Sequence, residues 1–306
     1  MPELPEVETI RRGLSKRLIG QKIKSITVLE KKSFQIADED RIWLEESVIK
    51  SVRRRAKVLM IDLDSDYTLL FHLKMTGQLI YREPNSELTD NRNFAAGHPT
   101  GDWLMDLPNK STRVYFEFED ASKLFFNDQR KFGWIKLLPT EKVMEQKFLH
   151  ELGPEIVDFT QDKIPEKISE STYKQVLSAI RRHNNAPIKA VILDQKVVAG
   201  IGNIYADEGL WGAKIHPATV VKDLTDRELR KLLREVKASM TRSIESGGST
   251  MQTFVKADGT KGNYLDLFAN VFRREGLPCP RCQTEIIKIR VAGRGTHICP
   301  KCQIKH

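Results

Sequence analysis

The sequence predicts an α+β protein: a leading α-helix with an N-terminal β-sandwich, then a helical domain, then a C-terminal zinc-finger hairpin. Three observations support this prediction. Apolar and polar side chains alternate in most segments between Gln21 and Leu138, apolar side chains recur at helical spacing from Thr140 onward, and all four cysteines lie in the last 28 residues. We expect domain boundaries at residues 1–138, 139–270 and 271–306.

The opening segment, MPELPEVETIRRGL, predicts the leading helix. Its apolar side chains recur on one helix face, at Val7, Ile10, Leu14 and Leu18. Removal of Met1 would leave Pro2 as a free secondary amine next to Glu3. Such an amine attacks a carbonyl or acetal carbon and forms an iminium, which is an electron sink for elimination at a sugar. From composition alone, a solvated leader remains the alternative to an active site.

Five segments in the first half have the residue types and alternation of β-strands. They are 22–30, 57–64, 67–73, 113–120 and the hairpin 123–138. Several such strands in succession favour a sandwich. Between them, residues 82–110 form a long polar stretch that we predict to be a loop, although connections of this length are uncommon in compact domains.

From residue 140 the pattern is helical. The predicted helices lie in segments 141–152, 171–183, 187–195, 203–211 and 225–248. The last one begins with a Thr225–Glu228 capping box. The residues Gly200-Ile201-Gly202-Asn203 precede the fourth helix, where glycines let backbone N–H groups approach a phosphate. A short motif of this kind also fits a simple turn.

The composition suits a polyanionic partner, although many basic proteins bind no nucleic acid, and it argues against a membrane protein. The chain has 50 Lys and Arg against 41 Asp and Glu, a net charge of +9, and a pI of about 9.3. Positive charge suits nucleic acid, because neutralised phosphates release counterions. No apolar run reaches the roughly 18 residues of a spanning helix, and no secretory signal pattern is visible. We therefore expect a cytoplasmic protein.

The four cysteines form two CxxC pairs, Cys279/Cys282 and Cys299/Cys302. Two such pairs around a strand-like stretch predict one tetrahedral zinc site, and a redox dithiol or a pair of disulfides is the weaker alternative. Four thiolate ligands leave no open position for water, so the predicted zinc is structural. Between the pairs, Arg294 stands between two glycines at the tip of the expected hairpin, a position that suits a phosphate or a carboxylate partner.

Taken in order, the motifs of the whole chain resemble those of one family. They are MPELPEVETIRRGL, RRRAK (53–57), HLKMTGQL (72–79), NDQRKFG (127–133), GIGNIYADEGLW (200–211), SIESGGST (243–250) and the two-CxxC module. The chain resembles bacterial formamidopyrimidine-DNA glycosylase. This resemblance implies a β-sandwich, a helix–two-turns–helix domain and a zinc finger, and the activity of a bifunctional DNA glycosylase and AP lyase that excises oxidised purines.

The resemblance also implies roles for single residues. Pro2 is similar to the family's nucleophile, which attacks C1′ of the damaged nucleotide, and Glu3 is similar to its general acid/base. Lys57 and Arg294 match catalytic-site residues that hold phosphates. Further contacts to DNA are expected from a set of mostly polar side chains, namely His72, Arg113, Arg130, Asn203, Lys189 and Glu208.

Three residues match those that fill the gap left by the flipped base, namely Met75, Arg130 and Phe132. A thioether and a phenyl ring can replace stacking, while a guanidinium can hydrogen-bond the orphaned cytosine. Taken singly, Met75 and Phe132 also fit strand core positions, and His72 and Lys57 also fit ordinary surface groups.

The chain departs from the family pattern in places. Residues 82–110 are longer than the usual loop by roughly twenty residues. Arg113 stands where many members have histidine, and Phe272 stands where they usually have tyrosine, which removes one phosphate contact. Residues 249–264 follow the pattern and resemble the family's flexible cap over the everted lesion.

The implied partner is double-stranded DNA with oxidised purines or abasic sites, bound by a monomer near the nucleoid, with one structural Zn²⁺ and no membrane. Two alternatives stay open. One is an endonuclease VIII-like glycosylase for oxidised pyrimidines, and the other is a non-catalytic protein that binds damaged DNA on the same scaffold. Leu4 and Val7 favour the purine branch, since the pyrimidine group typically begins Pro-Glu-Gly-Pro-Glu.

Overall fold

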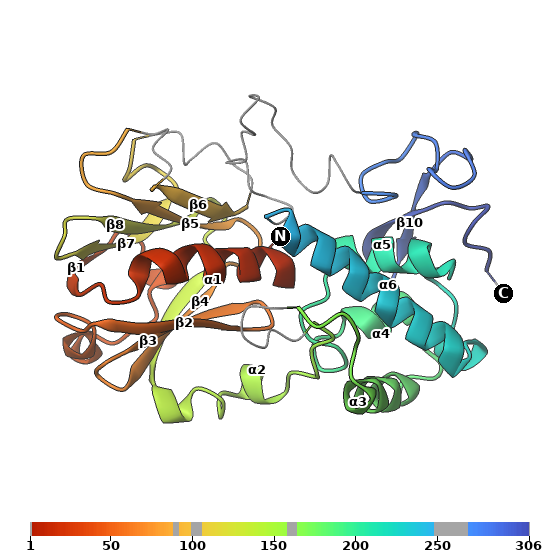
Figure 1. The fold of residues 1–306 in the computed structure, drawn as a ribbon, viewed down its shortest axis with the longest axis horizontal. Helices are drawn as coiled ribbons and strands as arrows, with labels where there is room; N and C mark the ends of the chain where they lie inside the picture. The colour runs from red at the N-terminus through yellow and green to blue at the C-terminus, as the bar shows by residue number, and fades with distance from the viewer. Residues whose placement is uncertain (1, 88–91, 99–105, 158–163, 248–268, 306) are drawn as a thin grey trace. The chain divides into compact units, whose positions relative to one another are not determined.

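The computed structural model describes residues 2–87, 92–98, 106–157, 164–247 and 269–305, which form two compact units (Figure 1). The first unit holds the described residues up to 150 together with Gly247, and the second holds those of 151–246 and 269–305. In this described part of the chain, no helix is both long and apolar enough to cross a membrane. The predicted cap at 249–264 lies outside the described residues. The described residues have the predicted α+β architecture.

The first unit contains two antiparallel sheets. The five-stranded sheet has the order β1 (Ile23–Val28), β7 (Thr112–Phe118), β8 (Lys123–Asp128), β5 (Gly77–Arg82) and β6 (Phe94–Gly97). The four-stranded sheet has the order β2 (Ile49–Arg55), β3 (Val58–Leu63), β4 (Tyr67–His72) and β9 (Trp134–Pro139). One buried apolar cluster is shared by side chains of both sheets, as the alternation of the strands predicts.

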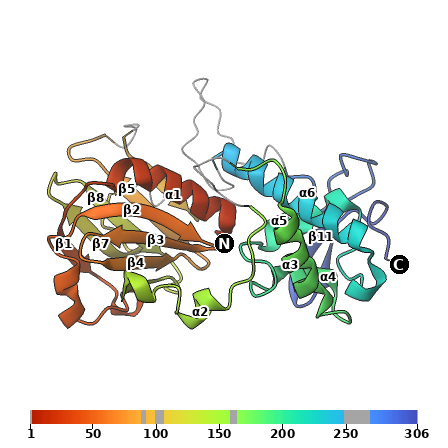
Figure 2. The ribbon, with the colours of Figure 1, turned by 60° about the horizontal axis from the view of Figure 1, so that its bottom comes forward.

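Helix α1 (Leu4–Leu18) lies along the sandwich edge formed by β2 and β6 (Figure 1). Its apolar stripe is at most 1% exposed and joins the sandwich core at Val7, Ile10, Leu14 and Leu18. Figure 2 shows α1 beside β2, with β3 and β4 following across the sheet. Burial of about four aliphatic side chains stabilises this attachment by roughly 6–12 kcal/mol before entropy is counted. The packing therefore fixes the helix whose first turn follows Pro2.

The stretch 82–110 differs from the predicted loop, because it contains strand β6. Phe94 packs so closely on Gly13 of α1 that a Cβ there would lie 2.2 Å from the ring. The guanidinium of Arg17 stacks 5.1 Å from the same ring and donates to the carbonyl of Arg92 at 2.8 Å. Tertiary contacts with α1, rather than alternation within four residues, account for this strand.

The second unit combines helices with a β-hairpin. Its elements are α3 (Glu170–Arg181), α4 (Ile188–Leu193), α5 (Asn203–Ala213), α6 (Asp226–Glu245), β10 (Ile287–Val291) and β11 (Arg294–Ile298). Helices α5 and α6 pack closely, since Gly209 leaves room for Val236, and β11 also contacts α5. The predicted capping box of Thr225 and Glu228 is present at the start of α6.

The predicted helix over 141–152 is wrong in extent. The structure has only a 3₁₀ turn, Thr140–Lys142, and the single turn α2 (Lys147–His150). Val143 and Leu149 are the buried aliphatic side chains here, and residues six apart do not share a helix face. Further 3₁₀ turns lie at Lys31–Ser33, Glu39–Trp43 and Val221–Asp223.

Candidate active site and metal centre

The first turn of α1 gathers buried polar groups next to Pro2. Pro2 is buried and directly precedes Glu3, which is the N-cap of α1; Glu3 and Glu6 are each 1% exposed. The backbone N–H of Glu3 donates to Oε2 of Glu6 at 2.7 Å, and the backbone N–H of Glu6 donates to the Glu3 side chain. This reciprocal pair fixes the Glu3 carboxylate at the positive end of the helix, beside Pro2.

Lys57 and His72 lie close together in sequence register, because Lys57 ends the turn before β3 and the next residue, Val58 of β3, pairs with His72 of β4. Nδ1 of His72 accepts from the backbone N–H of Lys74 at 3.0 Å, so Nε2 carries the proton of the neutral ring. Burial, and then the charges of Lys74 and Lys57, lower the pKa of His72 to about 3. The pair therefore offers one cation and one neutral N–H donor, which suits a phosphate oxygen.

Met75, Arg130 and Phe132 stand on two exposed turns of the first unit. Met75 follows β4 and is 38% exposed, while Phe132 follows β8 and is 49% exposed. The Arg130 guanidinium lies 4.8 Å from the centre of the Phe132 ring. This exposure excludes the alternative that Met75 and Phe132 are core residues, and it places two apolar groups and one cation on neighbouring turns.

Arg113, an expected DNA contact, is turned into the protein instead. It is only 8% exposed. Its Nε donates to the carbonyl of Asp128 at 2.7 Å, and its Nη1 donates to the carbonyl of Lys110 at 3.0 Å. The guanidinium is occupied by backbone oxygens and in this conformation does not present its charge to a DNA phosphate.

Lys189 was also expected to contact DNA, but it lies inside the protein. It is fully buried in an ion pair. Its Nζ lies 2.6 Å from Oδ1 of Asp207, and both side chains are 0% exposed. The same Nζ donates to Oγ1 of Thr296 at 2.7 Å, and Oδ2 of Asp207 accepts from the backbone N–H of His297 at 2.9 Å. The ion pair thus attaches β11 to helices α4 and α5.

Asn203 and Arg294 are brought together at the start of α5. Nδ2 of Asn203 donates to the carbonyl of Gly295 at 3.0 Å, and Arg294, the preceding residue, is exposed at the hairpin tip. The turn before it has left-handed backbone at Ala292 and Gly293, with φ of 48° and 76°. This arrangement leaves the Arg294 charge available at a helix N-terminus, which favours anions.

Glu208 is the third residue that was expected to contact DNA but is buried, with an exposed fraction of 3%. Its Oε1 accepts from the backbone N–H groups of Val271 and Phe272, each at 2.9 Å, and its Oε2 accepts from the side chain of Asn270 at 2.8 Å. Charge-assisted bonds of this kind are strong, and here they hold the chain segment that enters the cysteine module.

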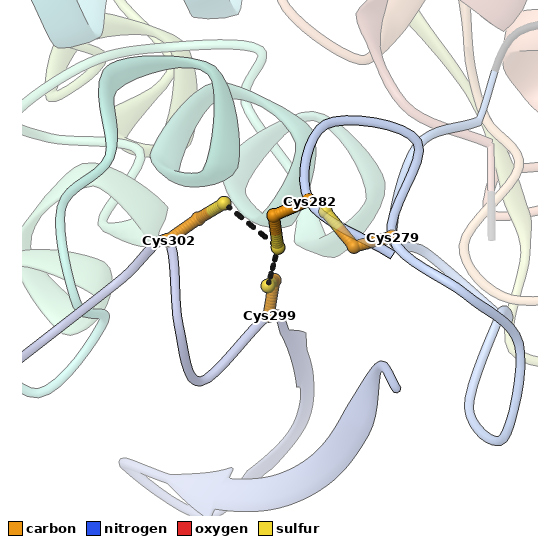
Figure 3. A group of neighbouring side chains, drawn as sticks. All are labelled: Cys279, Cys282, Cys299 and Cys302. Atoms are coloured by element: carbon orange, nitrogen blue, oxygen red, sulfur yellow. Dashed lines mark hydrogen bonds between the residues drawn. The ribbon is translucent and has the colours of Figure 1, made fainter. Parts of the chain in front are cut away.

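The four cysteines converge at one point, as Figure 3 shows. Their four Sγ atoms lie within 4.8 Å of one another, with Cys282 Sγ at 3.4 Å from that of Cys299 and 3.5 Å from that of Cys302. Zn–S bonds of about 2.3 Å give tetrahedral S–S edges of about 3.8 Å, so the donor set fits zinc. Trp211 of α5 donates its indole N–H to Cys279 Sγ at 3.4 Å, which joins the module to the helix.

Sequence reasoning missed the carboxylates that hold the expected residues in place. Asp128 lies within the motif NDQRKFG, and Asp207 directly follows the apolar residues Ile204, Tyr205 and Ala206 of α5. Both are 0% exposed. An acidic residue in an apolar segment is the signal that could have found Asp207, since a buried carboxylate needs a partner.

Comparisons with known proteins cover nearly the entire chain. Residues 1–135 match the family model described as the formamidopyrimidine-DNA glycosylase N-terminal domain. Residues 164–255 match that of the formamidopyrimidine-DNA glycosylase H2TH domain, and residues 276–304 match a zinc finger found in FPG and IleRS. With the sulfur geometry, the last match identifies one structural zinc held by the four cysteines.

Curated relatives and solved structures give the same result. The formamidopyrimidine-DNA glycosylase of Pelotomaculum thermopropionicum is 38% identical over 307 residues, covering 99% of each chain. That of Streptococcus pyogenes serotype M28 is 39% identical and covers 100% of this chain and 99% of its own. A structure of a Lactococcus lactis FPG variant with Fapy-dG-containing DNA has a TM-score of 0.80 at 32% identity, covering 99% of this chain and 100% of that one.

Proposed function

Since the chain belongs to the formamidopyrimidine-DNA glycosylase family, we propose that it removes oxidised purines from double-stranded DNA with Pro2 as the attacking group. It is a DNA glycosylase of base excision repair, and the family combines this activity with that of an AP lyase. The observation that carries the assignment to this site is the buried first turn of α1, where Glu3 is fixed beside Pro2.

The chemistry assigned to Pro2 and Glu3 proceeds in two stages. The secondary amine of Pro2 attacks C1′ of the damaged nucleotide, the N-glycosidic bond breaks, and the base leaves with its bonding electron pair. Glu3 supplies and removes the protons of sugar ring opening. Cleavage of the C1′–O4′ bond leaves an iminium at C1′, which accepts the electrons of the C2′–H bond as the 3′ phosphate leaves by β-elimination. Loss of the C4′ proton then expels the 5′ phosphate by δ-elimination.

The DNA backbone contacts are assigned to exposed or half-exposed groups. We assign phosphate binding to Lys57 and His72 in the first unit and to Asn203 and Arg294 in the second. His72 serves as a neutral donor there, since its pKa is lowered to about 3. Lys189, Glu208 and Arg113 are buried, so we assign them to holding these elements in place rather than to DNA.

Met75, Arg130 and Phe132 are assigned to the space left by the everted nucleotide. The thioether and the phenyl ring are exposed and apolar, so they can replace base stacking. The exposed guanidinium of Arg130 supplies the donors that the O2 and N3 acceptors of an orphaned cytosine require. Solved structures of relatives contain Fapy-dG and carbocyclic 8-oxo-G in DNA, which supports a purine lesion as the substrate.

The test of the lesion class is a side-by-side incision assay. Duplexes with 8-oxoguanine opposite cytosine and with thymine glycol opposite adenine are incubated with the enzyme, and the ends of the products are identified on a denaturing gel. We expect faster incision at 8-oxoguanine and a one-nucleotide gap with phosphates on both sides. A strong preference for thymine glycol would instead support the oxidised-pyrimidine alternative. That alternative is tested because a solved structure of Lactococcus lactis FPG contains DNA with an oxidised pyrimidine.

We further propose that the enzyme acts as a monomer on chromosomal DNA in the bacterial cytoplasm. Light scattering on the eluted protein should then give the 35.1 kDa of one chain. A mass near twice this value at working concentrations would contradict the monomer.

A further inference from the structure

One buried carboxylate joins the turn that carries Met75 to the turn that carries Arg130 and Phe132. Oδ1 of Asp128 accepts the hydroxyl of Thr76 and the backbone N–H of Arg130, the latter at 3.2 Å. Oδ2 of Asp128 accepts the backbone N–H of Gly133 at 2.7 Å. The Asp128 side chain is 0% exposed, so these bonds are shielded from water and their loss leaves a buried charge poorly satisfied.

The hydroxyl of Thr76, in the turn that carries Met75, bonds two groups of the other turn. It donates to Asp128 and also accepts the backbone N–H of Arg130 at 3.0 Å. A hydroxyl is the side-chain group that donates and accepts through one atom. Thr76 directly follows Met75, so the position of the thioether depends on the same contacts that hold the backbone of Arg130.

The backbone of both turns is strained in the same way. Lys74, before Met75, has a φ of 50°, and Lys131, between Arg130 and Phe132, has a φ of 57°. Residues other than glycine rarely adopt this left-handed region, and they keep it only where surrounding contacts over-determine it. The Thr76–Asp128 contacts supply that restraint at the point between the two turns.

Arg113 anchors this connection to the sheet. Its Nε donates to the carbonyl of Asp128 at 2.7 Å, and its Nη1 donates to the carbonyl of Lys110 at 3.0 Å. The backbone N–H of Asp128 in turn donates to the carbonyl of Ser111 at 2.8 Å. Arg113 therefore fixes the main chain of the residue whose carboxylate joins the turns.

We propose that Thr76, Asp128 and Arg113 are positioning residues that hold the Met75 turn in register with the Arg130–Phe132 turn, so that all three side chains enter the duplex together. This inference rests on the proposed function of those three side chains. Its consequence is specific: loosening the connection impairs excision from a duplex and the discrimination of the base opposite the lesion. It leaves the reaction of Pro2 with an abasic site in single-stranded DNA unchanged, because no base needs replacing there.

The test compares Thr76→Val with Thr76→Ser, which differ in whether the hydroxyl is kept. Thr76 is half-buried, and valine has nearly the same shape, so both variants should fold, with a lower melting temperature for Thr76→Val because Asp128 loses a hydrogen bond. We expect Thr76→Val to slow single-turnover excision from 8-oxoguanine:cytosine duplexes about tenfold, the effect of one lost hydrogen bond to a charged group. The preference for cytosine over adenine opposite the lesion should fall in parallel, while Thr76→Ser retains both.

Three results would overturn the inference. They are unchanged excision and discrimination by Thr76→Val, an equal loss in Thr76→Ser, and a parallel loss of cleavage at abasic sites in single-stranded DNA. Failure of the wild type to excise 8-oxoguanine would be a different result, since it would refute the proposed function and this inference with it. The wild-type measurement therefore separates the two failures.

A second variant, Arg113→Met, separates positioning from a phosphate contact. Binding to a duplex with an uncleavable abasic-site analogue is measured at several salt concentrations. A lost phosphate contact reduces the slope of log K against log salt by about 0.9, whereas a positioning residue leaves the slope unchanged. We expect an unchanged slope with reduced opposite-base discrimination, and a reduced slope would contradict the role assigned to Arg113.

Discussion

Glu8 of α1 and Arg54 of β2 form a buried ion pair that joins the helix following Pro2 to the turn that carries Lys57. The two side chains are 1% and 4% exposed, and Nε of Arg54 lies 3.3 Å from Oε2 of Glu8. Nη1 of Arg54 also donates to the carbonyl of Ala56 at 2.9 Å, in a turn where Ala56 has a φ of 49°. One guanidinium therefore connects the backbone next to Lys57 with the proposed nucleophile's helix.

Removing this guanidinium should destabilise the protein. Arg54→Met leaves the buried carboxylate of Glu8 with Arg11 and Arg12 as its charged partners, so we expect a cost of about 1.5–3 kcal/mol, that of a lost buried hydrogen bond to a charged group. The matched control is Arg53→Met, because the neighbouring Arg53 is 38% exposed in its pair with Asp62, and exposed pairs are worth about 0–1 kcal/mol. Urea unfolding of the two variants should differ in midpoint by this margin, and equal midpoints would refute the role given to Arg54.

The Lys189–Asp207 pair should act in the same way in the second unit. Asp207→Asn leaves Lys189 buried beside a neutral amide and weakens the hold on Thr296 and His297. We expect a loss of about 3–5 kcal/mol in unfolding free energy. Asp226→Asn is the control, since Asp226 is 66% exposed in its pair with Arg181. If both changes cost the same, the buried pair does not attach the hairpin.

The neutral His72 gives a prediction about pH. Its pKa in the folded protein is lowered to about 3, first by burial and then by Lys74 and Lys57, while the unfolded chain has about 6.5. Between these values the unfolded state binds the proton and the folded state does not, so stability is complete above pH 6.5 and falls as the pH decreases toward 3.

A variant isolates the contribution of His72 to this loss. His72→Asn keeps an acceptor for the Lys74 N–H but cannot titrate. We expect its unfolding free energy to fall less steeply than that of the wild type between pH 6.5 and 4. An unchanged slope would show that His72 ionises normally in the folded protein.

Zinc should be needed for the second unit and not for the chemistry of Pro2. We expect one zinc per chain by metal analysis. Chelation should abolish binding to duplex DNA, because the module that presents Arg294 loses the ion held by its four cysteines. Cleavage at abasic sites in single-stranded DNA should persist at a reduced level. A chelated protein that binds duplex DNA as tightly as before would contradict this assignment.

Local patterns predicted the elements whose signals lie within a few residues. The apolar spacing of α1 and the CxxC pairs belong to this group, because a helix face and a tetrahedral ligand set are readable from spacing. Strand β6 could not be predicted from the local sequence pattern, since its four residues depend on the packing of Phe94 against Gly13. The same limit applies to the helix predicted at 141–152, which the buried positions of Val143 and Leu149 do not support.

The candidate site shows the same difference between roles that local motifs indicate and contacts that only the folded chain forms. The resemblance named Pro2, Glu3 and Lys57, and the structure places Glu3 in the turn next to Pro2. It did not indicate that Arg113 and Lys189 are buried, because a cation in a motif is read as exposed until its partner is known. Those partners, Asp128 and Asp207, lie 15 and 18 residues further along the chain, and only the folded structure reveals such pairings.

The proposed role of Pro2 requires a covalent bond between its nitrogen and DNA, and borohydride trapping on an abasic duplex detects this bond. Intact mass first confirms that Met1 is absent, and the wild type, Pro2→Gly and Arg53→Met are then incubated with DNA and borohydride. We predict a stable protein–DNA adduct through Pro2 for the wild type and Arg53→Met. Pro2→Gly should still bind an abasic-site analogue but lose most of its lyase activity. No adduct from a wild-type protein with a confirmed Pro2 terminus, or full lyase activity in Pro2→Gly, would refute Pro2 as the nucleophile.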